Sequence, residues 1–302
     1  MSGSGRRATA GLPWVLPQTE RSGGDYGSVP SVTILMPAYQ AARTIVRALE
    51  SVRSQPFPDW QLIVVDDAST DGTGERATEV AARDSRITVL RNEKNLGAAA
   101  SMNVAWRRSD APFVAIVDAD DAVLPSRFSR PLEKLAANPE VSVLGGAAHF
   151  VDSAGRFLRT VTLPATHADL ERRRWYACPF VHPSVTMRRE FLESTGGYQD
   201  GLRLGEDYDL WMRGFFHGRF RYANLPEPLV VYTAKPVQRW TMIRASAGVR
   251  LRAGRRERRR LRSWWAAARI LAEGAVEQTG IFAWRDRVVG RTRGADASVL
   301  GI

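Results

Sequence analysis

The sequence contains a single cysteine, Cys178, among 302 residues. One cysteine excludes an internal disulfide and argues against a zinc site built on cysteine ligands. Lysine is almost as scarce, because three lysines stand beside forty arginines. Such a bias is also produced by GC-rich coding, so the arginine content alone does not indicate nucleic-acid chemistry.

Long hydrophobic runs are missing as well, since no stretch approaches the roughly 18 apolar residues of a membrane-spanning helix. The N-terminus carries Arg6 and Arg7 but lacks the apolar segment of a secretory signal. We therefore expect a cytoplasmic protein, with peripheral contact on the inner face of the membrane left open. The G-x-G-x-x-G and P-loop motifs are absent too, which excludes the usual dinucleotide and P-loop devices.

The chain does have a regular alternation of apolar runs and helical periodicity over its first 140 residues. This alternation predicts an α/β fold with a doubly wound, mostly parallel sheet. Shorter strands and turns follow and predict antiparallel additions to the sheet. The expected strands are 32–36, 62–65, 87–90, 113–118, 141–144, 149–151, 156–161, 182–187, 219–223 and 229–232, with helices at 41–53, 73–83, 95–107, 125–137, 190–194 and from 205.

We expect three regions along the chain. Residues 1–30 are rich in Gly, Ser and Arg and predict a disordered or loosely docked segment. Residues 31–235 form the α/β domain, and 236–302 a basic helical extension. The net charge of +11 lies largely in this extension. Its arginine-rich stretch is interpreted as a solvated helix face, as a patch that contacts an anionic membrane through 239–265, or as a site for an acidic acceptor.

Three acids follow a strand that we expect to be buried on both faces. The run from Phe113 to Val117 ends in Asp118, Ala119, Asp120 and Asp121. Open α/β sheets bind their ligands outside the carboxyl ends of the strands. If the chain stays extended here, Asp118 and Asp120 point the same way. Their hard oxygens suit Mg²⁺ or Mn²⁺, which bind one or two carboxylates together with substrate phosphates.

Acids also follow the second strand and open a later helix. Asp66 and Asp67 end the strand 62–65, where a turn or a helix cap would explain them equally well. Glu206 and Asp207 come directly after Gly205, where acids commonly complement the helix dipole. The residues alone leave these alternatives open.

Six segments follow one another along the chain over about residues 31–232. They are Val32–Tyr39, Val65–Thr73, Asn95–Gly97, Asp118–Asp121, His182–Val185 and Gly205–Trp211. In this order they resemble the family 2 glycosyltransferases with the GT-A fold. The resemblance implies transfer of a sugar from a nucleotide-diphosphate donor to an acceptor hydroxyl, with inversion at the anomeric carbon.

The resemblance also implies roles for the residues that match the family's motifs. Residues near the donor are Pro37, Ala38 and Tyr39 around the nucleotide, Asp67 on the base with Asp66 beside it, and Asn95 with Gly97 in a neighbouring segment. Asp118, Ala119 and Asp120 match the D-x-D that meets the metal and the diphosphate. Glu206 and Asp207 match the acidic pair that supplies the catalytic base, for which we favour Asp207.

The function expected is a metal-dependent glycosyltransferase of the hexosyltransferase type that uses Mn²⁺ or Mg²⁺. A carboxylate at Asp67 can accept the imide N–H of uracil or thymine, which favours UDP or dTDP donors, and GDP stays open. Carbohydrate, lipid-linked, peptide and small-molecule acceptors are all compatible with a role in polysaccharide biosynthesis. The rivals are a nucleic-acid-binding or scaffold protein built on an inactive GT-A domain, and a glycoside hydrolase with two carboxylates. We do not expect nucleic acid as the partner.

Overall fold

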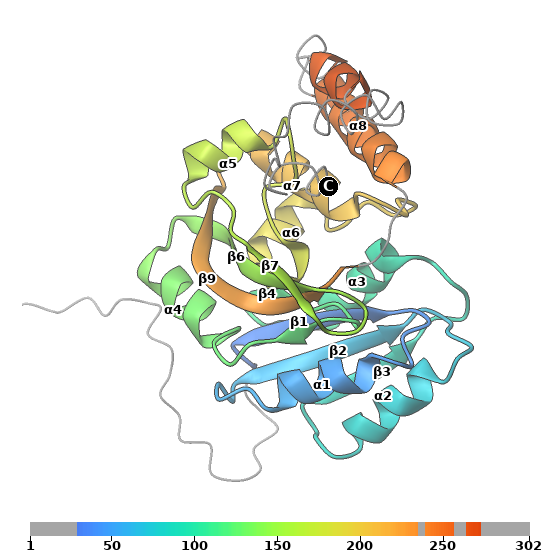
Figure 1. Cartoon of the computed structure of the whole chain (residues 1–302). Helices are drawn as coiled ribbons and strands as arrows, with labels where there is room; N and C mark the ends of the chain where they lie inside the picture. Colours follow the sequence, from blue (N-terminus) through green and yellow to red (C-terminus); the bar gives the residue numbers. More distant parts are fainter. Residues whose placement is uncertain (1–28, 235–238, 257–263, 273–302) are drawn as a thin grey trace, which may run out of the picture.

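A computed structural model describes residues 29–234, 239–256 and 264–272 (Figure 1). The disorder expected for the N-terminal segment therefore falls on residues that lie almost entirely outside the described ranges. The same holds for most of the C-terminal extension beyond residue 256. No helix within the described ranges is long and apolar enough to cross a membrane.

The first half of the chain alternates strands and helices as predicted. Strands β1, β2, β3 and β4 pair in parallel in the order β3-β2-β1-β4. Buried apolar runs such as that of β2 suit a sheet covered on both faces. The elements are β1 (Val32–Ala38), α1 (Ile45–Arg53), β2 (Trp60–Asp66), α2 (Thr73–Ala81), β3 (Ile87–Arg91), α3 (Ala98–Trp106) and β4 (Phe113–Ile116).

The second half extends the same sheet beyond β4, where β8 pairs antiparallel to β4 and to β6. The full order is β3-β2-β1-β4-β8-β6-β9-β5, with β7 paired to β6. A mixed sheet with a parallel core and antiparallel additions is the fold class that the sequence predicted. The elements are β5 (Ala122–Val123), α4 (Ser129–Ala137), β6 (Val141–Val151), β7 (Phe157–Val161), α5 (His167–Arg173), η1 (His182–Ser184), β8 (Thr186–Arg188), α6 (Arg189–Thr195), α7 (Glu206–His217), β9 (Arg221–Thr233) and α8 (Arg239–Arg256).

Two pairs of short strands predicted for the second half are in fact single long strands. β6 continues through Gly145 and Gly146. A Cβ at Gly145 would lie 2.1 Å from Asn224 Oδ1, and one at Gly146 would lie 2.4 Å from Leu229 Cδ1. The glycines are therefore needed for close approach of β9 rather than for a turn. β9 in turn passes through two prolines where its register against β6 shifts.

Other boundaries also differ from the prediction. The segment predicted as a strand at 182–187 begins as the 3₁₀ helix η1, and α4 begins at Ser129, not at Pro125. Helix α5 and the two-residue strand β5 were not predicted. β4 ends at Ile116, two residues before Asp118, because Asp121 N donates to Asp118 O at 3.2 Å and closes a turn. The extended chain that we expected from Asp118 to Asp120 is therefore wrong.

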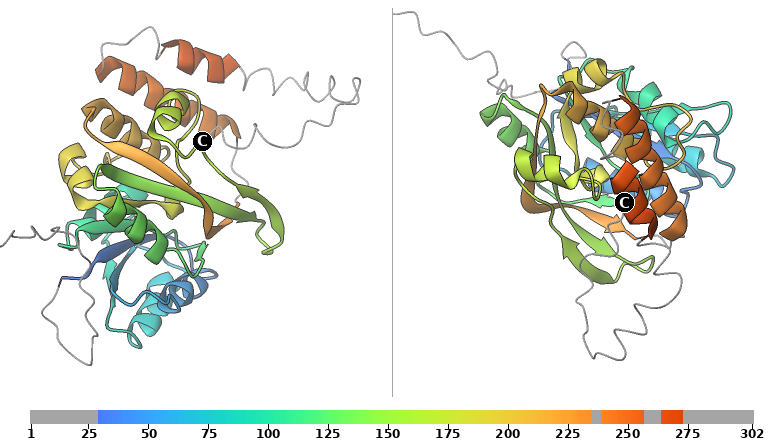
Figure 2. Two further views of the ribbon diagram at one scale, coloured as in Figure 1. Left: turned by 90° about the vertical axis from the view of Figure 1, so that its left-hand side faces the viewer. Right: turned by 90° about the horizontal axis from the view of Figure 1, so that it is seen from above.

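Helices cover the two faces of the sheet (Figures 1 and 2). A layer of apolar side chains lies between the sheet and the helices on each face. Ile34 and Met36 of β1 pack under α1 and α2, whereas Leu35 packs under α3 and the helices of the second half. This split follows from the alternation of side chains along a strand. Trp211 of α7 is fully buried in the second layer, which confirms its predicted role in packing.

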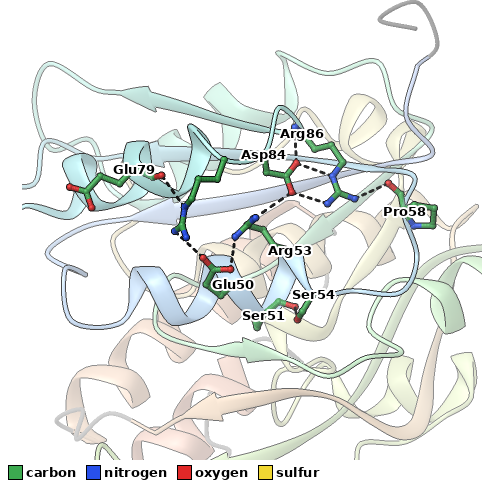
Figure 3. A network of polar contacts seen from close by, with 9 residues as sticks. Glu50, Ser51, Arg53, Ser54, Pro58, Glu79, Asp84 and Arg86 are labelled. Atoms are coloured by element: carbon green, nitrogen blue, oxygen red, sulfur yellow. Dashed lines mark hydrogen bonds and ion pairs between the residues drawn. The ribbon is translucent and has the colours of Figure 1, made fainter. Parts of the chain in front are cut away.

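Ion pairs on the outer surface join α1 to the turn after α2 (Figure 3). Glu50 accepts from Arg53 at 2.7 Å and from Arg83 at 3.0 Å. Asp84 lies 3.5 Å from Arg53 and 2.8 Å from Arg86. The Arg83–Glu50 pair is exposed and is expected to contribute little to stability, whereas Asp84 is 11% exposed and its pairs are partly buried. Their partners come from the regular first half of the chain.

Candidate functional site

The carboxyl ends of β1, β2 and β4 lie side by side at one rim of the sheet. Ala38 of β1 is in register with Asp66 of β2, and Leu35 with Ile116 of β4. Neighbouring strands are about 4.8 Å apart, so the ends of β2 and β4 lie roughly 10 Å apart across β1. The residues predicted near the donor and near the metal therefore come from adjacent strand ends.

The loops after β1 and β2 are held together in an unusual backbone conformation. Gln40 and Ala68 are the two non-glycine residues with positive φ in the described chain, at 51° and 60°. Gln40 N donates to Ser69 Oγ at 3.0 Å, and Thr70 N donates to Gln40 Oε1 at 3.0 Å. Backbone strain of this kind clusters at functional sites, where the surrounding contacts maintain it. The two loops thus form one rigid edge of the rim.

Three residues predicted to surround the nucleotide lie at the end of β1. Pro37 and Ala38 belong to the strand itself, and Ala38 is buried. Tyr39 follows it with 54% of its surface exposed. An exposed aromatic ring on a rigid loop offers a flat apolar surface on which a nucleobase can stack. Tyr39 is the predicted donor residue that this arrangement leaves most accessible.

Asp66 and Asp67 are both buried, and each is engaged by other parts of the chain. Asp66 accepts from Ser69 N at 3.1 Å, and Arg91 Nη1 lies 3.2 Å from its other oxygen. Asp67 Oδ1 accepts from Leu96 N at 2.9 Å, and Oδ2 from Gly97 N at 2.8 Å.

Asn92 Nδ2 also donates to Asp67 Oδ1, at 2.7 Å. The carboxylate of Asp67 therefore anchors the loop that leads into α3. That loop includes Asn95, whose Nδ2 donates to Asp67 O at 3.5 Å. The contact between Asp67 and a base stays a prediction.

The acids after β4 divide into two kinds. Asp121 is 1% exposed, and its Oδ1 accepts from Thr233 N at 2.7 Å. Asp118 and Asp120 are partly exposed. Thr233 Oγ1 and Arg47 Nη2 donate to the carbonyl of Asp120, at 2.7 and 2.6 Å. The end of β9 thus holds the D-x-D turn in place through Thr233.

Arg47 and Thr233 were not predicted as site residues. Their contacts are to the backbone of Asp120 and cross 73 and 113 residues of chain. A backbone carbonyl exists at every position, so no local pattern in the sequence indicates which distant side chain will bind it. Only the pairing of β9 with β5 brings Thr233 here.

The acidic pair opens α7, with Gly205 in the left-handed region at φ 75° before it. Asp207 Oδ1 accepts from Tyr208 N at 2.7 Å, and the thiol of Cys178 donates to Asp207 Oδ2 at 3.6 Å. Burial raises the pKa of the Cys178 thiol, with Asp207 adding to the effect, so the thiol stays protonated. Helix dipoles favour negative charge in the first turn.

Electrostatics place the acids of both halves in one neighbourhood. Burial and then the charge of Asp207 raise the pKa of Glu206 to about 7, and Asp118 adds to this effect. Burial, together with Asp118, Asp121, Asp120 and Asp207, raises the pKa of Tyr232. Acids of the D-x-D turn and of the start of α7 therefore affect the pKa of Glu206 and that of Tyr232. In the sequence, 86 residues separate Asp120 from Glu206.

A further contact joins the loop before α7 to the donor-side loop. Arg203 Nη1 donates to Asn95 Oδ1 at 3.1 Å. His182 Nε2 lies 3.0 Å from the hydroxyl of Tyr198 in the same region. The predicted residues of both halves therefore lie around one rim. Asp66 and Asp67 at this rim are bound by other residues of the chain.

The residues present fit a divalent cation. Within the described ranges no group of three or more His, Cys, Asp or Glu side chains forms a ready-made metal cage. Mg²⁺ and Mn²⁺ do not require one, because substrate phosphates and water complete their shell. Asp118 and Asp120 are hard oxygen donors in a region where burial, and then the charges of Asp207 and Asp118, raise the pKa of Glu206. Both the donor set and the local charge suit a cation.

Comparison with known proteins gives a consistent result. The model of "Glycosyl transferase family 2" matches residues 33–196. EpsE of Bacillus subtilis, which carries a glycosyltransferase name, is 34% identical over 67% of this chain and 72% of its own length. The succinoglycan biosynthesis protein ExoU of Rhizobium meliloti is 34% identical over 62% of this chain, which spans 57% of ExoU.

Solved structures share the fold at lower sequence identity. The mannosyltransferase PcManGT of Pyrobaculum calidifontis, solved with GDP-Man and Mn²⁺, has a TM-score of 0.62 and 19% identity, over 92% of this chain and 85% of its own. Residues 1–349 of S. aureus TarS, solved with UDP-GlcNAc, have a TM-score of 0.57 and 20% identity, over 80% of this chain and 71% of theirs. The fold is therefore GT-A-like.

Proposed function

This chain belongs to the family 2 glycosyltransferases, and on that premise we propose that it is an inverting enzyme with Asp207 as its general base. The observation that carries the proposal is that Asp118, Asp120 and Asp207 all add to the effect of burial in raising the pKa of Tyr232, while the next residue, Thr233, binds Asp120 O and Asp121. Sugar transfer with inversion needs a bound diphosphate on one side of the sugar and a base on the other. Two chain halves that contribute acids to one rim meet this need.

Asp207 is proposed as the base because its partner acid has a different environment. Burial and then the charge of Asp207 raise the pKa of Glu206 to about 7, so about half of this carboxyl is protonated at pH 7. Asp207 lies in the first turn of α7, where its Oδ1 accepts from Tyr208 N and the helix dipole favours negative charge. Two neighbouring acids held in different environments are the usual arrangement when one of them has to accept a proton.

The reaction proposed is a single displacement. The oxygen of the acceptor hydroxyl forms a bond to the anomeric carbon, and Asp207 accepts the proton of that hydroxyl. The bond from that carbon to the diphosphate breaks, and its electron pair leaves with the nucleoside diphosphate. Asp118 and Asp120 would hold the divalent cation, which when bound supplies positive charge that stabilises this leaving group.

The donor site is proposed along the loops after β1 and β2. Tyr39 offers its exposed ring to the base, and Asp67 fixes the loop of Asn95 and Gly97 on the other side. UDP, dTDP and GDP donors are all compatible with this arrangement. Relatives bind donors of two of these kinds, since PcManGT was solved with GDP-Man and TarS with UDP-GlcNAc.

The acceptor is proposed to be a carbohydrate or a carrier-linked carbohydrate. ExoU and AmsE of Erwinia amylovora are named for succinoglycan and amylovoran biosynthesis. Peripheral contact with an anionic membrane stays a prediction for 239–265, of which 257–263 lie outside the described ranges. Trp264 and Trp265, at 58% and 67% exposure, are the side chains that suit such contact.

A thermal-shift screen of nucleotide sugars with Mn²⁺ tests this proposal. The matching donor is expected to raise the melting temperature in a dose-dependent way, because a ligand that binds only the folded state stabilises it. EDTA is expected to abolish release of the nucleoside diphosphate, and added Mn²⁺ or Mg²⁺ to restore it. Full turnover in EDTA would contradict the cation role, and salt-sensitive binding of RNA or DNA without any donor shift would favour the nucleic-acid alternative.

A further inference from the structure

Helix α8 packs against the first turn of α7, which carries the acidic pair. Val249 and Ala253 of α8 are buried in the same apolar layer as Tyr208 and Trp211 of α7. A Cβ at Gly205, the residue before the pair, would lie 3.2 Å from Val249 Cγ2. The family model ends at residue 196, well before α8 begins. Helix α8 therefore contacts the start of α7, the helix that carries Glu206 and Asp207, and both helices lie beyond the matched residues (Figure 1).

Arg250 of α8 lies in this region and contacts both Trp175 and Tyr208. It is fully buried, although the sequence suggested a solvated helix face for its stretch. Its Nε donates to Trp175 O at 2.8 Å, and its Nη2 donates to Tyr176 O. Its guanidinium carbon also lies 5.2 Å from the centre of the Tyr208 ring. A planar guanidinium that binds two successive carbonyls is held in one orientation.

These contacts surround Asp207 on two sides. Tyr208 directly follows Asp207 in the chain, and its hydroxyl donates to Arg174 O. The Trp175–Tyr176 carbonyls belong to the turn that leads to Cys178, whose thiol donates to Asp207 Oδ2 at 3.6 Å. Arg250 therefore holds both the residue after Asp207 and the turn that supplies a partner to its carboxylate.

Removal of the guanidinium would release both sides together. The buried carbonyl of Trp175 and the partly buried carbonyl of Tyr176 would lose their donor, and a cavity would open beside Tyr208. The turn and the start of α7 would then be free to shift. Catalysis is sensitive to such shifts, because misplacement of a reacting group by about 1 Å can cost on the order of 100-fold in rate.

We propose that Arg250 is a positioning residue, which holds Asp207 in place for proton abstraction. The inference rests on the proposed function of Asp207. Helix α8 is then part of the catalytic unit, and its arginine-rich sequence contains at least one residue with a role in the site. Arg250 acts through Tyr208 and the 174–178 turn, with no contact to the donor.

The test compares Arg250→Met and Arg250→Lys with Arg244→Met, an exposed arginine on the same helix, in the full chain. The number and Kd of sites for UDP and GDP with Mn²⁺ are measured by calorimetry. Release of UDP from UDP-GlcNAc and of GDP from GDP-Man is measured with Mn²⁺, with water as the acceptor. Rates are expressed per nucleotide-binding site, so that unfolded protein does not count as slow enzyme.

Arg250→Met is expected to lower the rate per site at least tenfold, with Kd changed less than twofold. Arg250→Lys is expected to lower it less, since one ammonium cannot reproduce the fork of donors. If Arg250→Met does not fold, the test uses Arg250→Lys instead. A full rate in Arg250→Lys would then overturn the inference. Arg244→Met is expected to match the wild type.

A second comparison separates positioning from general weakening of the fold. In an Asp207→Asn background, Arg250→Met is expected to cause no further loss, because residues that act through one group are not additive. An equal loss in both backgrounds, or a loss of nucleotide binding as large as the loss of rate, would overturn the inference alone. A wild-type chain that turns over neither these two donors nor any dTDP-sugar or other donor found in the thermal-shift screen would overturn the proposed function and the inference together.

Discussion

The two halves of the molecule differ in how deeply they bury arginine, since the buried arginines of the described chain all lie beyond β4. In the first half, Arg53, Arg83 and Arg86 form ion pairs with acids at the surface (Figure 3). Beyond β4, Arg127 and Arg250 are fully buried, and their guanidinium groups donate to backbone carbonyls. Arg188 and Arg213 donate to carbonyls as well.

This difference follows from the regularity of the backbone. A parallel β-α repeat satisfies its own N–H and C=O groups within strands and helices. The second half contains turns and the 3₁₀ helix η1, whose buried carbonyls need other donors. Arg127 supplies several at once, to Ile116, Pro183 and Val185. The regular half therefore presents the rim that we propose to bind the donor, and buried arginines help to hold the elements of the irregular half in place.

The largest expected effect is a loss of turnover with unchanged nucleotide binding. Asp207→Asn is expected to lower the release of nucleoside diphosphate by on the order of 10³-fold, because the base can no longer accept a proton. Binding of UDP or GDP with Mn²⁺ should be unchanged by calorimetry. Glu190→Gln, an exposed acid on the neighbouring helix α6, serves as the control and should retain full activity. Normal turnover in Asp207→Asn would contradict the assignment.

The converse variant acts on the donor side. Asp120→Asn is expected to weaken nucleotide binding in Mn²⁺ by on the order of 100-fold, since a lost cation ligand is worth several kcal/mol. In EDTA the variant and the wild type should bind equally, which isolates the cation contribution. Equal affinities in Mn²⁺ would show that Asp120 does not hold the cation.

The contrast between arginines can be sharpened by a pair of stability measurements. Arg127→Met is expected to lower the free energy of unfolding by about 3 kcal/mol, because several buried carbonyls lose their donor. Arg83→Met removes an exposed ion pair and should cost less than about 0.5 kcal/mol. Urea denaturation of both variants gives the comparison. Similar losses would remove the proposed difference between the halves.

The smallest expected effect concerns the pH dependence of stability. The pKa of Glu206 is about 7 in the folded chain against 4.5 for the free residue, so the folded state binds more protons in this window. The contribution of Glu206 to stability is therefore complete below pH 4.5 and is lost as the pH rises through 7. Glu206→Gln is expected to show a smaller decline than the wild type from pH 4.5 to 7, measured by urea denaturation at each pH. Parallel curves for the two proteins would exclude this effect.

Much of the fold and of the site could be predicted from the sequence. The alternation of apolar runs and helical periodicity predicted the parallel strands β1 to β4 with their helices. It also placed the acids at strand ends, as observed. Several of the errors lie at glycines and prolines, and another lies at the turn from Asp118 to Asp121. Gly145 and Gly146 were interpreted as the end of a strand, whereas they allow β9 to approach β6.

The sequence alone determined that carboxylates gather at one rim of a central sheet, because residues that follow parallel strands meet at the same edge. Only the tertiary structure decided which of these acids accept hydrogen bonds from N–H groups of the chain itself. Asp67 binds backbone N–H groups 29 and 30 residues away, and Asp121 binds one 112 residues away. Local periodicity specifies where a strand ends, whereas the partner of a buried polar group depends on which distant segments pack beside it. For that reason the burial of Arg250 against the catalytic helix is visible only in the folded chain.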